Sequence, residues 1–104
     1  MDELIQKIDE TVIKLLGYDH EAYEEAANDL TNMMVRVFPE IILYYADPRM
    51  SDRAEEASYW PGQLERILNA FNSGDDLATA DILYNETRAN LLELKSVLKE
   101  KGIN

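Results

Sequence analysis

Hydrophobic residues recur every three or four positions along four stretches of this chain, which is the spacing of one face of an α-helix. Short breaker clusters separate the stretches, at Gly17, at Asp47-Pro48 and around Gly74. Because polar residues fill most of the remaining positions, each stretch predicts an amphipathic helix. We therefore predict an all-α fold, an up-and-down bundle of four main helices that form one domain over residues 1–104.

The first and fourth stretches are the most regular. The apolar positions of the first are Leu4, Ile5, Ile8, Val12, Leu15 and Leu16. Those of the fourth are Leu77, Ala80, Tyr84, Thr87, Leu91, Leu94 and Leu98, with Leu83 and Val97 beside them. Asp2 and Glu3 begin the first helix, Asp75 and Asp76 begin the last, and lysines end it. This order matches side-chain charge to the helix dipole.

Two prolines modify the middle stretches. The second stretch keeps its phase through Pro39 and predicts one helix over residues 20–46. We expect this helix to be kinked rather than broken, because proline removes one backbone hydrogen bond without moving the apolar face. The third stretch contains Trp60-Pro61-Gly62, and proline followed by glycine is a stronger breaker. We expect the third helix to be split there.

Local sequence also predicts where two helical segments begin. Asp19 suits the N-cap of the second helix, and Tyr18 and Tyr23 have the spacing of a hydrophobic staple. Asp47 followed by Pro48 suits an N-cap and a first helical position.

The chain is strongly acidic, with 21 acidic and 10 basic residues and a net charge of -11. Such a surface repels phosphate groups, so we expect neither a nucleic acid nor a membrane as a partner. No apolar run approaches the length of a membrane span, and the lack of cysteine fits a reducing compartment, so we expect a cytoplasmic protein. Asp19 to Asp29 form an acidic block, which is either a solvated helix face or a docking surface for a basic partner.

Few residues are suited to catalysis or metal binding. His20 is the single histidine, and it lies at a predicted helix start between Asp19 and Glu21, where an exposed imidazole is the ordinary expectation. The sequence has no glycine-rich phosphate loop and no metal-ligand spacing. We therefore expect no catalytic residue, no metal site and no cofactor, and we predict that the protein is not an enzyme.

One polar group lies at the edge of the fourth apolar face. Asp81 has Asn85 one turn later, and a hairpin between the third and fourth helices would bring Arg66 opposite Asp81. The first interpretation is a structural ion pair between Arg66 and Asp81. The second is a polar cluster of Asp81, Asn85 and Arg66 inside a cleft that binds a small ligand.

Four aromatic residues, Tyr44, Tyr45, Tyr59 and Trp60, flank the turn between the second and third helices. Aromatic residues at the end of a bundle commonly cap its core, with a polar tip in water. Tyrosine and tryptophan are also frequent anchors of protein interfaces. Both interpretations, a core cap and the apolar centre of a protein interface, stay open from the sequence.

In the last third of the chain a turn, Gly74-Asp75, leads into a helix that carries Ala80-Asp81, Leu83, Glu86 and Leu91. This pattern resembles a family of small, uncharacterised helical bacterial proteins. The resemblance implies a bacterial, cytoplasmic helical protein and no particular activity.

These observations favour a non-enzymatic protein-interaction module, such as an adaptor or a small export-type chaperone, whose partner is another protein. The alternative is a small-ligand-binding or hydrolytic helical bundle that uses Asp81 and neighbouring carboxylates. A homo-oligomer formed through the second and fourth helices is a third possibility. A polar pocket around Asp81 would favour the ligand-binding bundle, whereas an exposed apolar groove would favour the interaction module.

Overall fold

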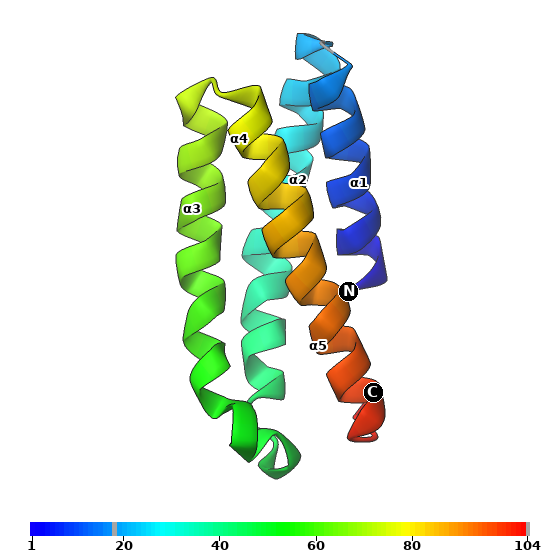
Figure 1. Cartoon of the computed structure of the whole chain (residues 1–104), viewed down its shortest axis with the longest axis vertical. Coiled ribbons are helices and arrows are strands. Elements are labelled where there is room, and N and C mark those ends of the chain that lie inside the picture. Colours follow the sequence, from blue (N-terminus) through cyan, green and yellow to red (C-terminus); the bar gives the residue numbers. More distant parts are fainter. Residues whose placement is uncertain (18, 104) are drawn as a thin grey trace.

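Four helical columns pack side by side in the computed structural model, which describes residues 1–17 and 19–103 (Figure 1). The first two columns are α1 (Asp2–Leu16) and α2 (His20–Tyr44). The third is α3 (Tyr59–Ser73), preceded by the 3₁₀-helical segment η1 (Pro48–Ser58). The fourth is continuous and consists of α4 (Asp76–Asp81), the π-helical segment η2 (Ile82–Arg88) and α5 (Ala89–Glu100). The predicted all-α, up-and-down bundle is confirmed.

The turn between α1 and α2 follows the local sequence. α1 ends at Gly17, and the Asp19 carboxylate accepts a hydrogen bond from the backbone N–H of Ala22, with 3.1 Å between nitrogen and oxygen. The N-cap predicted at Asp19 is therefore confirmed, because this bond satisfies one of the free N–H groups of the first turn. The staple predicted between Tyr18 and Tyr23 involves a residue outside the described ones.

α2 continues through Pro39 without interruption, as the phase of its apolar face predicts. Phe38 and Ile41, on either side of the proline, are both buried, so the same face of α2 points into the core before and after it. Pro39 itself is exposed, where loss of one backbone hydrogen bond is tolerated because water can reach the free carbonyl.

The third stretch is split, but two residues earlier than expected and into two kinds of helix. The junction between η1 and α3 lies at Ser58 and Tyr59, and Trp60-Pro61-Gly62 forms the first turn of α3. Pro61 does not break the helix. Proline lacks a backbone N–H group, but in the first turn such a group has no acceptor within the helix, so no helical hydrogen bond is lost. Asp47 caps η1: its carboxylate accepts hydrogen bonds from the side chain and the backbone N–H of Arg49, which lower the pKa of Asp47 to about 2.

The fourth column begins after a turn in which Gly74 adopts a φ of 74°, a conformation that favours glycine. Within η2 the Thr87 hydroxyl donates to the carbonyl of Ile82, five residues earlier. The prediction that Leu77 and Tyr84 belong to the core is wrong, since their side chains are 76% and 48% exposed. Leu77 lies in the first turn of α4, and beside Tyr84 it is Leu83 that fills the core.

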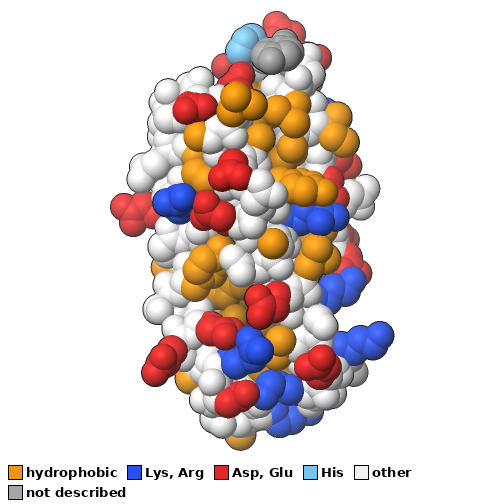
Figure 2. Space-filling view, viewed as in Figure 1, with side chains coloured by type: hydrophobic (Ala, Val, Ile, Leu, Met, Phe, Trp, Pro, Cys, Tyr) orange, Lys and Arg blue, Asp and Glu red, His pale blue; other side chains and the backbone are white. Residues whose placement is uncertain are grey.

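The columns differ in length, and this difference shapes the bundle. α1 has 15 residues and α2 has 25, so the N-terminus lies about halfway along the 44 Å molecule (Figure 1). Beyond that level three columns remain, and aromatic and sulfur-containing side chains close the core there. Its buried members include Trp60, Phe38, Ile41 and Met50. On one face of the surface, hydrophobic side chains gather over α1 and α4 (Figure 2).

Replacing Leu91 with alanine tests whether this core carries the stability of the fold. Leu91 is fully buried, so Leu91→Ala should lower the free energy of unfolding by about 2 to 5 kcal/mol through lost burial and the cavity left behind. The adjacent Leu92 is 40% exposed, so Leu92→Ala is the matched control and should cost less than about 1 kcal/mol. Urea melts measure both values. Equal losses would show that this face is not the core.

Candidate functional site

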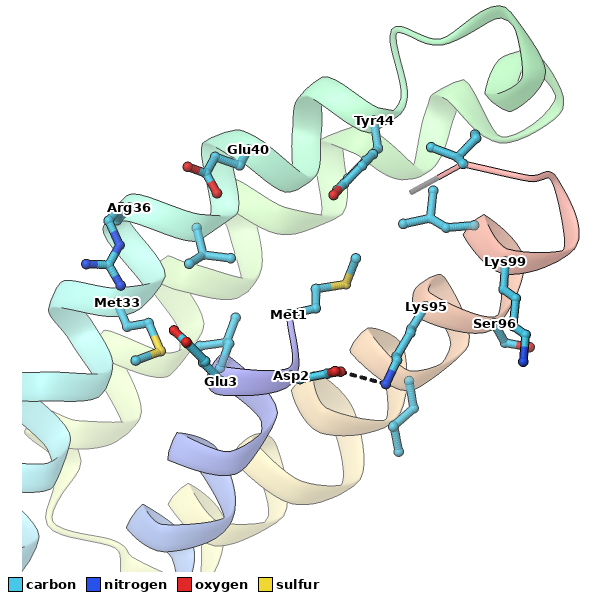
Figure 3. A pocket seen from close by; sticks show the side chains of 15 residues that line it. Met1, Asp2, Glu3, Met33, Arg36, Glu40, Tyr44, Lys95, Ser96 and Lys99 are labelled. Carbon is cyan, nitrogen blue, oxygen red and sulfur yellow. Dashed lines mark ion pairs between the residues drawn. The ribbon is translucent and has the colours of Figure 1, made fainter.

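A groove of about 810 Å³ lies in the half of the bundle that α1 does not reach. α2 forms one side and α5 the other, and Met1 extends between them (Figure 3). Ile103 also lines the groove. The groove therefore occupies the place where a longer α1 would have packed.

The two walls present side chains at helical spacing. From α2 the groove is lined by Met33, Arg36, Val37, Glu40 and Tyr44, and from α5 by Leu92, Lys95, Ser96 and Lys99. Three buried residues, Leu4, Leu98 and Ile103, lie at its base. A concave surface with an apolar base and two helical walls is typical of sites that bind amphipathic helices.

Charged groups of both signs border the groove. Lys95 of α5 binds Asp2 of α1, with 2.6 Å between Nζ and Oδ1, and this hydrogen bond lowers the pKa of Asp2 (Figure 3). Arg36, Glu40 and Lys99 form no ion pair with any residue that the structure describes. These three groups are therefore available to charged side chains of an occupant.

The C-terminal residues are held in place at one end of the groove. Gly102 has a φ of 71°, and the Ile103 N–H donates to the carbonyl of Leu98 at 2.8 Å, which folds Ile103 back onto α5. Lys101 donates to the carbonyl of Arg49 and to the carboxylate of Asp52, at 2.8 and 2.7 Å. These contacts fix the end of α5 against η1, so this side of the groove is preformed.

The structure keeps Asp81 and Asn85 of the expected polar cluster together, but pairs Arg66 with another carboxylate. Asp81 is exposed and accepts a hydrogen bond from Asn85 at 2.6 Å. The expected ion pair between Arg66 and Asp81 is wrong, because Arg66 binds Glu86 in a bidentate pair at 3.0 and 2.9 Å. Asp81 does not line the groove between α2 and α5.

The choice of partner follows from the register of the hairpin between α3 and the fourth column. The Gln63 amide donates to Thr87 at 2.8 Å, and the Asn90 amide donates to Tyr59 at the same distance. These contacts place Arg66 between the levels of Asp81 and Glu86, and its side chain extends toward Glu86. The bidentate geometry there satisfies two guanidinium N–H groups at once.

The aromatic residues are mainly a core cap. Trp60 is 2% exposed, its indole N–H donates to the Tyr45 hydroxyl at 3.1 Å, and its ring meets Phe38 edge to face at 5.3 Å. Tyr45 is buried as well, and burial raises the pKa of both Tyr45 and Tyr59. Trp60 and Tyr45 therefore cannot form the centre of a protein interface, which corrects the second interpretation of this group. Tyr44 is the member that reaches the groove.

The described residues hold no group of three or more histidine, cysteine, aspartate or glutamate side chains placed to bind a metal ion. His20 is exposed at the start of α2. None of the helices described is both long and apolar enough to cross a membrane.

Sequence reasoning did not find the groove, although one signal for it was present. The first apolar stretch is shorter than the second, so two antiparallel neighbours of unequal length had to leave part of α2 uncovered. Which residues then line the exposed part depends on the placement of α5, and this is set by contacts of η1 that no periodicity encodes.

No protein-family model, curated protein or solved structure matches this chain. Its function is therefore argued from the geometry of its own residues.

The Arg66–Glu86 pair can be tested with a double-mutant cycle. Exchanging the two charges, in Arg66→Glu with Glu86→Arg, should recover part of the stability that either single change loses, and the coupling should be small because the pair is exposed. The same cycle between Arg66 and Asp81 is the control and should be additive. Coupling to Asp81 that equals the coupling to Glu86 would contradict the assignment.

The bond between Trp60 and Tyr45 gives a second test. Tyr45→Phe leaves the buried indole N–H without its acceptor and should lower the free energy of unfolding by about 1 to 3 kcal/mol in urea melts at neutral pH. Tyr45→Phe should leave the ring packing intact, so the intrinsic tryptophan fluorescence should still report a buried Trp60. A variant as stable as the wild type would show that water or another group satisfies the indole.

Proposed function

We propose that this protein is a non-enzymatic interaction module that receives one amphipathic helix of a partner protein in the groove between α2 and α5. The observation that carries the proposal is the position of the groove between α2 and α5, in the half of the bundle that α1 is too short to reach. A helix placed there would complete the four-column cross-section. It would cover the side chains that α1 leaves exposed.

The dimensions and spacing of the lining residues support a helical occupant. Side chains at intervals of three and four on α2 and α5 form ridges, and a third helix packs its own ridges between such rows at interaxial distances of about 8 to 10 Å. The apolar positions of the occupant would meet Leu92, which is 40% exposed, and the half-buried Met33 and Val37. Complete burial of one large apolar side chain of the occupant contributes about 1.5 to 3 kcal/mol to the free energy of binding.

The border charges add orientation rather than affinity. Arg36 and Glu40 stand one turn apart on α2, while Lys99 stands on α5. An occupant with a carboxylate toward Arg36 and Lys99 and a basic group toward Glu40 would satisfy all three. Exposed ion pairs of this kind contribute about 0.2 to 1 kcal/mol each to the free energy of binding. They therefore contribute more to specificity among helices than to affinity.

A small molecule is the second candidate for the same groove, because its volume lies within the range of about 300 to 1,000 Å³ typical of ligand pockets. The hydrolytic alternative that relied on Asp81 has no such support, since that carboxylate is exposed and hydrogen-bonded to Asn85. The proposed ligand-binding site therefore moves from Asp81 to the groove.

The interaction module can be tested by selecting binders from a library of random peptides displayed on phage. We expect the enriched sequences to carry apolar residues at helical spacing, because the walls of the groove have that spacing. Synthetic copies of them should lose at least about tenfold in affinity toward Leu92→Glu, as expected for a charge placed at the centre of an apolar contact. Isothermal titration calorimetry measures the affinities.

The matched control is Leu43→Glu, which makes the same change at an exposed leucine of α2 that does not line the groove. Both variants should melt near the wild-type temperature. Equal effects of the two substitutions, or enriched peptides without helical periodicity, would contradict the proposal. A small molecule whose stabilising effect is abolished by Leu92→Glu, in the absence of any peptide binder, would establish the second candidate instead.

A further inference from the structure

We propose that a second surface of this protein, on the seam between α1 and α4, docks a basic amphipathic helix. The surface consists of four exposed apolar side chains, Ile13, Leu16, Leu77 and Tyr84, which we call the seam patch. None of them lines the groove between α2 and α5, so this proposal stands independently of the proposed function.

Each of the four side chains leaves about half or more of its surface open to solvent, although Arg88 covers one side of the Tyr84 ring. Ile13 is 71% exposed, Leu77 is 76% exposed, and Leu16 and Tyr84 are each 48% exposed. Isolated apolar residues on a surface are ordinary, but a contiguous group over two neighbouring helices marks an interaction site. Figure 2 shows hydrophobic side chains gathered over α1 and α4 on this face.

Two contacts show that the four residues face the same seam. Asp9 of α1 binds Arg88 of η2, with 2.7 Å between Oδ1 and Nε, and Ile13 and Leu16 follow Asp9 at helical intervals of four and three. The guanidinium of Arg88 also lies over the Tyr84 ring, 4.9 Å from its centroid. Tyr84 and Leu77 are seven residues apart, about two helical turns, so both lie on the side of the fourth column that approaches α1.

The charges around the seam patch determine the kind of partner. Asp81 is exposed on α4 and Asp76 is half-buried, and neither forms an ion pair within the described part of the chain. Arg88 is already bound to Asp9, and Lys14 points into a hollow that it shares with Asp19 and Asp76.

The acidic block Asp19 to Asp29 extends this character along the first turns of α2, at the same end of the bundle. An apolar patch in an acidic surround is complementary to a helix that has one apolar face flanked by lysine and arginine. A basic group of this helix would find a partner in the exposed Asp81, and the net charge of -11 would accelerate the approach of the helix.

A second copy of this chain fits the patch less well. Placing two seam patches together would bring the exposed Asp81 of both copies into one interface, and each molecule carries a net charge of -11. Like charges brought together in this way destabilise a complex. Self-association at the patch is therefore an outcome that the experiment must be able to detect.

Three synthetic peptides of about 18 residues, long enough for several helical turns, supply the probes. The first has leucines on one helical face and lysines on the other. The second has the same composition in an order without an apolar face, and the third has glutamate in place of lysine. Each is titrated into ¹⁵N-labelled protein at about 150 mM salt, where screening weakens contacts beyond about 8 Å.

We expect the leucine–lysine peptide to bind and to shift the amide signals of the second half of α1, α4 and η2. The double variant Ile13→Ser with Leu77→Ser should weaken its binding by at least about tenfold, because both anchors are removed. The matched control is Val35→Ser with Leu43→Ser, two similarly exposed side chains on α2, and its affinity should equal that of the wild type. Leu92→Glu, the groove variant, should also leave the affinity unchanged.

Several results would overturn the proposal. Equal binding of the peptide without an apolar face would show electrostatic attraction alone. Equal binding of the glutamate peptide would remove the argument from charge, and shifts confined to α2 and α5 would assign the peptide to the groove. Absence of binding at millimolar concentration would exclude such an occupant. Signals of the patch that shift with protein concentration alone would identify a second copy as the occupant.

Discussion

Four helical columns cannot fill a bundle along its whole length when one of them is ten residues shorter than its neighbour, as α1 is relative to α2. The side chains of α2 that extend past the N-terminus need other partners. Trp60, Phe38 and Tyr45 supply part of this cover through their rings and the indole–hydroxyl bond. What they do not cover becomes the groove, so the core cap and the groove have the same cause.

The same constraint explains why η1 matters beyond its own residues. It carries no long apolar face, and Met50 is its buried anchor. Yet its Arg49 and Asp52 bind Lys101 and Gly102 at the end of α5. These polar contacts between η1 and the end of α5 therefore maintain the distance between α5 and α2. The groove stays open without a helix inside it.

Apolar periodicity and capping residues were enough to predict the helices, because both act within a few residues of chain. Asp19 and Asp47 cap the segments that they were expected to cap. The ion pair of Arg66 was not predictable in this way, since it depends on the register between two columns and on a π-helical segment that moves Glu86 relative to Asp81. Trp60 could not be assigned for a related reason: its burial depends on where α3 begins, and Pro61 is compatible with either a break or a first turn.

Met1 and Ile103 both border the groove, and this has a practical meaning for anyone who handles the protein. An affinity tag or fluorescent fusion attached to Met1 would be tethered beside the opening, where its linker competes with an occupant at high effective concentration. Exposed positions on α3, such as Glu65, are remote from both the groove and the seam patch. Immobilisation or labelling through a cysteine introduced there would leave both surfaces free, and the absence of native cysteine makes that attachment selective.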